Sequence, residues 1–273
     1  MRTAISSFEL LEPRSVTEAL RLLRKQPPAV PMAGCTDLYV SANLGTLAER
    51  RLLSLWHLDA LRRIDLRAGL LSIGALATYA DIIRSPLAAR RIPMLVAASR
   101  EIGSVQVQNR GTIGGNIVNA SPAGDTLPVL AAAEATLVLQ NLDGSRRVPF
   151  GLFYAGYRRT VMRPDELLVA IEIPSIEGRQ WFRKVGTRAA QAISKVVMAA
   201  VRAPRPRIAL GSVAPTVVRL PRTEEALSAG RPIEEAQAML QTEIVPIDDL
   251  RSTSAYRRRV AANLLARFWE QTA

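Results

Sequence analysis

The sequence predicts an α+β protein. Both helical and strand periodicities occur along its 273 residues, but the two kinds of element do not alternate in the regular order of a doubly wound sheet. After Pro174 the segment SIEGRQ has the character of a linker, and a new set of strand patterns begins beyond it. The chain is therefore expected to divide into residues 1–175 and 176–273.

The first helix is expected at residues 15–25. Ser15 and Glu18 form an S-x-x-E capping box, and the apolar residues that follow recur at helical spacing. Pro27 and Pro28 are expected to end this helix, because proline lacks the N–H group that a helix interior requires.

The later elements are predicted from periodicity and from turn residues. Strands are expected at 70–78, 135–141, 166–174, 181–186 and within 207–220. The segment 191–201 is a mainly apolar element whose type stays open. Helices are expected at 78–90, 92–103, 125–135, 222–229, 233–244 and from about Ser252 onward.

Composition limits the classes of function. The formal net charge is +12, nearly all from arginine, but the arginines form no long block and aromatic residues are only 5% of the chain. Nucleic-acid binding is therefore not expected, and an arginine bias or an acidic protein partner explains the charge better. No run approaches the roughly 20 apolar residues of a membrane span, and the N-terminus lacks the pattern of a signal peptide.

Cys35 is the only cysteine. An intramolecular disulfide is excluded, which suits a reducing, cytoplasmic environment. One cysteine also cannot ligate an iron–sulfur cluster, and no metal site is expected in this chain.

The stretch RGTIGGNIVNASPAGD at 110–125 concentrates glycines and short polar side chains between two apolar segments. Converging backbone N–H groups bind phosphate, and glycine allows a ligand to approach them closely. The stretch matches neither the G-x-G-x-x-G nor the P-loop pattern. A second small-residue turn, MAGCTDL at 32–38, could form a similar cradle. Tight turns packed against neighbouring backbone explain both segments equally well.

AGCTDL and GTIGGNIVNASPAGD resemble the paired FAD-binding motifs of the molybdenum hydroxylase flavoproteins, which include the FAD-carrying parts of xanthine dehydrogenase and carbon monoxide dehydrogenase-type enzymes. Further similar segments, such as LLSIGALATYADI and RIALGSVAPTVVR, follow in the family's order and extend the resemblance over essentially the whole chain. It implies a two-part FAD-binding fold of the vanillyl-alcohol oxidase-like type at 1–175, with subdomains at roughly 1–60 and 61–175. A smaller C-terminal α/β domain is implied at 176–273.

The resemblance also implies which residues contact FAD. The diphosphate is expected to bind the backbone around the two motifs. Other residues match the family positions that contact the polar groups of the cofactor, pack against its rings or lie beside the flavin. The set is Pro31, Met32, Ala33, Gly34, Cys35, Thr36, Asp37, Leu38, Ile102, Gly111, Thr112, Gly114, Gly115, Asn116, Asn119, Ser121, Asp125, Leu167, Leu168 and Lys184.

Two positions in this set carry specific expectations. Lys184 matches the family lysine beside the pyrimidine end of the flavin, where an ammonium favours the anionic reduced flavin and raises its reduction potential. A solvated lysine at a strand end is the alternative. Cys35 departs from the family, which usually has glycine or another small polar residue there. Ile102 stands where xanthine dehydrogenase has an aromatic residue over the flavin.

The implied function is electron transfer. By resemblance, the chain is the FAD subunit of a heterotrimeric molybdenum hydroxylase. The other two subunits would be a large subunit with a molybdenum cofactor and a small subunit with 2Fe–2S clusters, and the complex would assemble further as a dimer of heterotrimers. Electrons would pass from the small subunit through FAD to an external acceptor. Two alternatives stay open: a stand-alone flavin oxidase or dehydrogenase acting on a small substrate, and a non-enzymatic basic assembly module.

Overall fold

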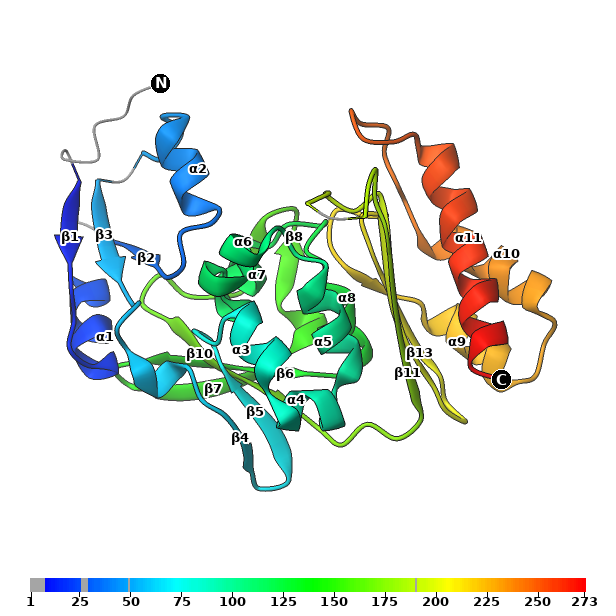
Figure 1. The fold of residues 1–273 in the computed structure, drawn as a ribbon, viewed down its shortest axis with the longest axis horizontal. Coiled ribbons are helices and arrows are strands. Elements are labelled where there is room, and N and C mark those ends of the chain that lie inside the picture. Colours follow the sequence, from blue (N-terminus) through cyan, green and yellow to red (C-terminus); the bar gives the residue numbers. More distant parts are fainter. Residues whose placement is uncertain (1–7, 26–28, 49, 190) are drawn as a thin grey trace.

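The computed structural model describes residues 8–25, 29–48, 50–189 and 191–273, and it confirms the predicted α+β class. Figure 1 shows three units side by side along the long axis: a small N-terminal sheet with its helices, a central sheet beneath a group of helices, and a C-terminal sheet backed by three further helices. The candidate site lies where these units meet.

The N-terminal unit is a parallel sheet of three strands in the order β1-β3-β2, formed by β1 (Glu9–Leu11), β3 (Arg51–Ser54) and β2 (Val30–Met32). Helix α1 (Val16–Arg24) follows β1, and the short helix α2 (Leu38–Asn43) follows β2. Parallel strands direct their following loops to the same edge of a sheet. The loops after β2 and β3 are therefore neighbours.

Ser15 caps α1 as predicted, but the capping box is incomplete because Glu18 accepts from Arg14 and not from Ser15. The Ser15 hydroxyl accepts a hydrogen bond from the Glu18 N–H at 3.1 Å, and the Glu18 carboxylate accepts one from the Arg14 N–H at 2.8 Å. Pro27 and Pro28, which were expected to end this helix, lie outside the described residues.

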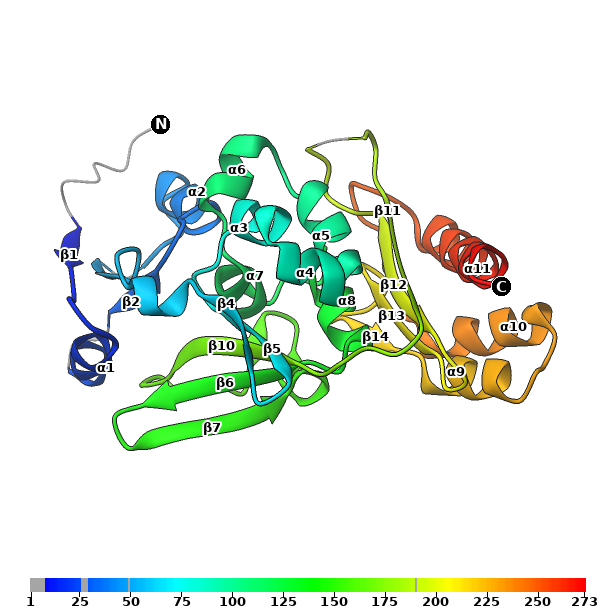
Figure 2. The ribbon, with the colours of Figure 1, turned by 60° about the horizontal axis from the view of Figure 1, so that its bottom comes forward.

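The central unit is an antiparallel sheet of five strands in the order β4-β5-β10-β6-β7, formed by β4 (Ile64–Arg67), β5 (Leu70–Gly74), β10 (Leu167–Ile173), β6 (Thr136–Asn141) and β7 (Gly144–Pro149). Helices cover one face of the sheet and leave the other face open (Figure 2). The strands expected at 135–141 and 166–174 are confirmed, whereas the strand expected at 70–78 ends at Gly74.

Six short helices form the layer over this sheet: α3 (Tyr79–Arg84), α4 (Pro86–Arg91), α5 (Pro93–Arg100), α6 (Val105–Arg110), α7 (Ile113–Asn119) and α8 (Leu127–Ala132). The single helix expected at 78–90 is wrong, because Ser85 leaves the helical conformation before Pro86. The Ser85 hydroxyl then caps α4 by accepting the Ala88 N–H at 3.1 Å.

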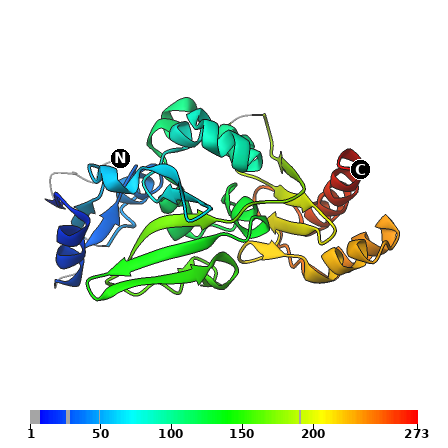
Figure 3. The same ribbon diagram turned by 90° about the horizontal axis from the view of Figure 1, so that it is seen from below.

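The C-terminal unit is an antiparallel sheet in the order β11-β12-β13-β14, formed by β11 (Arg179–Val185), β12 (Val196–Arg202), β13 (Arg207–Gly211) and β14 (Val218–Arg219). The element left open at 191–201 is thus strand β12. One face of the sheet carries the helices α9 (Pro221–Ser228), α10 (Ile233–Glu243) and α11 (Ser254–Gln271), as Figure 3 shows from below.

Alternation along β12 joins the C-terminal sheet to both of its neighbours. Ala199 and Val201 are buried in the core of the central unit, whereas Met198 and Ala200 are buried against the C-terminal helices. Successive side chains of a strand point to opposite faces, so both faces of β12 are covered and the strand is apolar from Val196 to Val201.

Short elements complete the fold. The 3₁₀ turns η2 (Asp59–Leu61) and η3 (Phe150–Leu152) precede β4 and the hairpin of β8 (Tyr154–Gly156) with β9 (Arg159–Thr160). The Tyr154 hydroxyl donates to the Ile117 carbonyl at 3.0 Å and so ties the hairpin to α7. Among the described residues, no helix combines the length and the apolar character needed to cross a membrane.

Candidate functional site

The two predicted loops meet through their main chains. Gly34, in the loop after β2, faces the carbonyl oxygen of Arg110, the last residue of α6, so closely that a β-carbon at Gly34 would overlap that oxygen. Only glycine permits this approach without moving one of the loops. The structure therefore brings together the two sequence motifs, which are about 75 residues apart in the chain.

The first loop exposes an uninterrupted run of backbone donors. Within the described structure, the N–H groups of residues 33–38 donate to no protein acceptor. Cys35 has a left-handed backbone with φ of 61°, and Asp37, two residues further on, is right-handed with φ of −112°. Main-chain N–H groups without protein acceptors in such a turn are candidates for binding an anion.

The second motif is organised differently. The sequence left it open as a phosphate-binding cradle or a tightly packed turn. Seven of its residues form α7, and the N–H groups of Ile113, Gly114, Gly115 and Asn116 already donate within the protein, to Ala77, Ala75 and Thr112. A β-carbon at Gly114 would come within 2.6 Å of the Ala75 carbonyl oxygen. The glycine at 114 therefore allows α7 to pack against the end of β5, as a tightly packed turn would require.

The polar side chains of the second motif lie along α7 and the turn after it. Thr112 caps α7, with its hydroxyl accepting the Gly115 N–H at 3.1 Å. Further hydrogen bonds hold the other members: Thr126 donates to Asn116 at 2.6 Å, Arg158 donates to Asn119 at 3.2 Å, and the Ser121 hydroxyl accepts from the Ala123 N–H at 3.3 Å. Asn116, Asn119 and Ser121 remain partly accessible.

Lys184 and Asp125 form a buried ion pair between the central and C-terminal units. The Lys184 Nζ lies 2.7 Å from Asp125 Oδ2 and also donates to the Glu101 carbonyl at 3.0 Å, and only 4% of the lysine side chain is exposed. The alternative of a solvated lysine at a strand end is therefore wrong. The other oxygen of the carboxylate, Asp125 Oδ1, is buried without a hydrogen-bond partner among the described residues.

The environment of Asp125 favours its protonated form. Burial raises the pKa of Asp125 to about 6, and the Lys184 ammonium opposes this rise while the nearby Glu101 carboxylate adds to it. Burial likewise raises the pKa of Glu101. A carboxyl group with a raised pKa beside a buried cation is typical of functional sites, although structural ion pairs share this character.

The three predicted apolar positions are placed differently. Leu167 is buried in the core of the N-terminal unit and Leu168 in that of the central unit, because successive side chains of a strand point to opposite faces. Ile102 is partly buried against the central core. The two leucines therefore fill hydrophobic cores. Ile102 is partly accessible, and it lies near the Lys184–Asp125 pair because Lys184 donates to the carbonyl of the preceding residue, Glu101.

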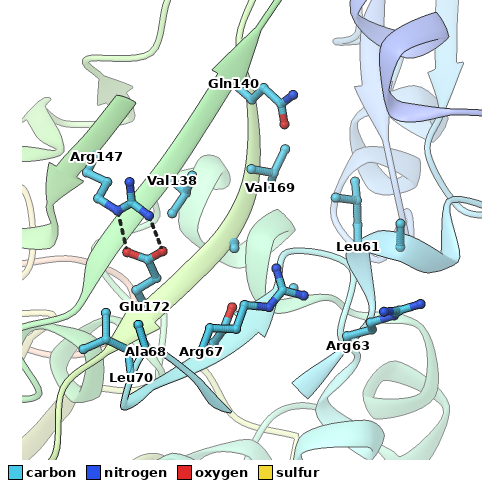
Figure 4. A pocket seen from close by; sticks show the side chains of 14 residues that line it. Leu61, Arg63, Arg67, Ala68, Leu70, Val138, Gln140, Arg147, Val169 and Glu172 are labelled. Atoms are coloured by element: carbon cyan, nitrogen blue, oxygen red, sulfur yellow. Dashed lines mark hydrogen bonds and ion pairs between the residues drawn. The ribbon is translucent and has the colours of Figure 1, made fainter. Parts of the chain in front are cut away.

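Two cavities lie in the N-terminal half. One, of about 440 Å³, is strongly apolar and reaches the first loop through Met32, Cys35 and Leu38. The other, of about 390 Å³, lies on the open face of the central sheet, where Arg147 and Glu172 form an ion pair (Figure 4). No residue of the predicted FAD site lines this second cavity. We therefore place the candidate site at the two loops and not in the sheet-face cavity.

The sequence prediction missed two contributors to this site, Trp56 and Arg110. The Arg110 guanidinium lies 3.8 Å from the centre of the Trp56 ring, and Trp56 comes just after β3, beside the loop that follows β2. The sequence carried no local signal for this pair, because Trp56 comes beside the loop only through the long-range parallel pairing of β3 with β2.

Fold and site together define a class: an α+β protein with a main-chain loop of N–H donors that lack protein acceptors, where its N-terminal and central units meet. A family model described as the FAD binding domain in molybdopterin dehydrogenase matches residues 6–176, and one described as the CO dehydrogenase flavoprotein C-terminal domain matches residues 181–272. The chain therefore belongs to the FAD-binding medium subunits of the molybdenum hydroxylase family, whose members are oxidoreductases, and FAD is its cofactor.

Relatives cover the chain along its whole length. The glyceraldehyde dehydrogenase medium chain of Sulfolobus acidocaldarius is 30% identical, over 97% of this chain and 98% of the relative. The carbon monoxide dehydrogenase medium chain of Hydrogenophaga pseudoflava is 32% identical over 95% of both. The solved carbon monoxide dehydrogenase from the same organism, in a form lacking the Mo-pyranopterin moiety of its molybdenum cofactor, matches all of both chains with a TM-score of 0.92 and 29% identity.

Asp125 should make stability depend on pH in an unusual direction. Its folded pKa of about 6 exceeds the ordinary value of 3.8, so the native state binds more protons than the unfolded state between these values and loses stability as pH rises. Relative to Asp125→Asn, the wild-type free energy of unfolding should fall by about 2 kcal/mol from roughly pH 4.5 to pH 7. Urea denaturation at both pH values measures this.

Asp81 provides a control of opposite sign for that experiment. Its pKa is lowered by its hydrogen bonds to Thr78 and Arg84 in spite of burial, so its contribution is present at neutral pH and is lost as the pH falls. Wild type relative to Asp81→Asn should therefore gain stability with rising pH. If the stability difference between wild type and variant changed with pH in the same direction for Asp125→Asn and Asp81→Asn, the raised pKa of Asp125 would be contradicted.

Cys35 stores backbone strain, since a residue with a β-carbon costs roughly 1–2 kcal/mol in the left-handed region that it occupies. Cys35→Gly should raise the free energy of unfolding by about 0.5–1 kcal/mol, because relief of strain exceeds the added flexibility of the unfolded chain. Cys35→Val should lower it by at least about 1 kcal/mol. Equal stability of the two variants would show that the loop relaxes.

Proposed function

We propose that the chain holds FAD with the diphosphate of the dinucleotide on the N–H groups of residues 33–38. The observation that carries this proposal is the run of donors without protein acceptors, placed at an edge of a parallel sheet and kept open by Gly34. A diphosphate supplies the acceptors that this loop lacks. The side chains of Asn116, Asn119 and Ser121 are proposed to contact the polar groups of the same ligand.

The second motif takes a supporting part in this proposal. The N–H groups of residues 113–116 are already used within the protein, so they are not the main diphosphate donors. The glycines at 111 and 114 bring α7 close to Tyr79 and Ala75, and through Arg110 they fix the wall against which Gly34 lies. Loss of this packing would open the first loop.

We further propose that the chain is the electron-transfer subunit of a heterotrimer. Bound FAD supplies the chemistry of accepting electrons one at a time and releasing them to an external acceptor. A partner with 2Fe–2S clusters would provide the electrons, and a large partner with a molybdenum cofactor would oxidise the substrate. The relatives named as medium chains and as an FAD-binding subunit of xanthine dehydrogenase support this division of labour.

The proposed complex is a dimer of heterotrimers in the cytoplasm. Within this chain, residues 1–175 would bind FAD through subdomains at roughly 1–60 and 61–175, and residues 176–273 would contribute Lys184. The core shared by β12 and the central unit supports a fixed position of Lys184 relative to the FAD-binding part.

The test begins with the isolated full chain. The purified protein should take up one FAD per chain and show a flavin absorption band, and reduction by small organic substrates alone should not occur. Recovery of the tagged chain from its native host should bring two further proteins, which carry molybdenum and iron. A colourless chain with no FAD uptake would contradict the proposal, and direct reduction by a small substrate would support a stand-alone oxidase.

Lys184 and Asp125 should affect the flavin potential in opposite directions. A nearby ammonium favours the anionic reduced flavin, so Lys184→Met should lower the midpoint potential by roughly 20–60 mV, the equivalent of about 1–3 kcal/mol. Asp125→Asn should raise it, because the cation then acts without its counter-charge. Spectroelectrochemistry of the FAD-loaded chain measures both.

The control for that measurement is Lys25→Met, an exposed lysine at the C-terminal end of α1 in the N-terminal unit. It should leave the potential unchanged. The double variant Lys184→Met with Asp125→Asn leaves no buried unpaired charge, and its potential should lie between those of the two single variants. An unchanged potential in both single variants would remove Lys184 from the flavin's surroundings.

A further inference from the structure

Trp56 lies between two arginine side chains. The guanidinium carbon of Arg62 is 4.1 Å from the centre of the ring and that of Arg110 is 3.8 Å from it. Two guanidinium groups at these distances from one centre cannot share a face without clashing, so they occupy opposite faces. Each cation is attracted by the electron-rich face of the indole.

The two arginines are held very differently. Arg62 donates to the Trp56 and Leu76 carbonyls and forms an ion pair with Asp59, so its hydrogen-bonding groups are engaged. Arg110, in the part of the chain that the structure describes, has the Trp56 ring as its partner and no carboxylate. Its charge is therefore held in place by stacking, while its N–H groups remain available to a ligand.

This stack stands beside the bare donor loop. Met32, the last residue of β2, pairs with Ser54 of β3, and the Leu55 N–H donates to the Met32 carbonyl at 2.8 Å. Trp56 is the next residue, and residues 33–38 follow Met32, so both leave the same edge of the sheet. The main chain of Arg110 contacts Gly34 within that loop.

The charge of Arg110 also acts on the loop itself. Burial raises the pKa of the Cys35 thiol, and Arg110 opposes that rise by favouring the thiolate. The field of the guanidinium therefore reaches the middle of the donor run. Neutral N–H groups alone leave most of the charge of a diphosphate uncompensated, and a cation at this place would balance part of it.

We propose that Arg110 binds the diphosphate of the dinucleotide as its neutralising cation, and that Trp56 is a positioning residue that holds Arg110 at the donor loop. This inference rests on the proposed FAD function. It adds a side-chain cation to a cradle otherwise made of main-chain groups. It also explains why the arginine lies over an aromatic ring and has no carboxylate partner, since a carboxylate would compete with the ligand for it.

The test compares FAD with riboflavin, which has the same ring system and no phosphate, on apoprotein prepared from the full chain. Arg110→Met should weaken FAD binding about tenfold or more at low salt and leave riboflavin binding unchanged. The dependence of FAD affinity on ionic strength should also become shallower. Arg259→Met, an exposed arginine of α11 in the C-terminal unit, is the matched control and should change neither.

The positioning part is tested at Trp56. Trp56→Leu should weaken FAD binding less than Arg110→Met does, and Trp56→Phe should restore most of the loss, because phenylalanine keeps a face for the guanidinium. Arg110→Lys retains the charge and should retain the salt dependence, which protects the test if Arg110→Met folds poorly. If Trp56→Phe and Trp56→Leu bind FAD equally, the positioning role is overturned.

The outcomes separate the two proposals. If the wild-type chain takes up no FAD, the proposed function itself fails. If the wild type binds FAD and Arg110→Met binds it as well as Arg259→Met does, with the same salt dependence, then Arg110 does not contact the diphosphate. The function would stand in that case and this inference would not.

Discussion

The main-chain contact of Gly34 with Arg110 is the constraint on which the site depends. It joins the N-terminal sheet to the helices of the central unit at a point where no side chain fits. As a consequence the loop after β2 is held open, with its N–H groups at residues 33–38 turned away from protein acceptors. Unpaired donors are costly when shielded from water, so such a loop persists only where solvent or a ligand satisfies its N–H groups.

The C-terminal unit is coupled to the same region by charge. A buried ion pair gains little net stability, because desolvation of both partners offsets their attraction. The pair of Lys184 with Asp125 therefore needs another explanation than stability alone, and its place between β11 and the turn before α8 supplies one. It fixes a cation of the third unit against the second motif. The shared core along β12 makes that position rigid.

Much of the fold was predictable, because periodicity and capping are local properties. The Ser15 cap and the strands at 135–141 and 166–174 follow from short windows of sequence. The site was predictable mainly through resemblance. The sequence could not show which of the two motifs keeps N–H donors without protein acceptors. Gly114 and Gly34 look alike in sequence and differ only in the groups that face them. The stacking of Arg110 on Trp56 joins residues 54 positions apart and left no local signal.

Hydrogen–deuterium exchange of the backbone amides, with and without FAD, tests the central claim most directly. The amides of residues 33–38 should exchange rapidly in the free chain and become protected when FAD is added. Those of residues 113–116, which already donate within the protein, should change little. Protection that appears at 113–116 and leaves 33–38 unchanged would contradict the account, because the diphosphate would then lie on the second motif.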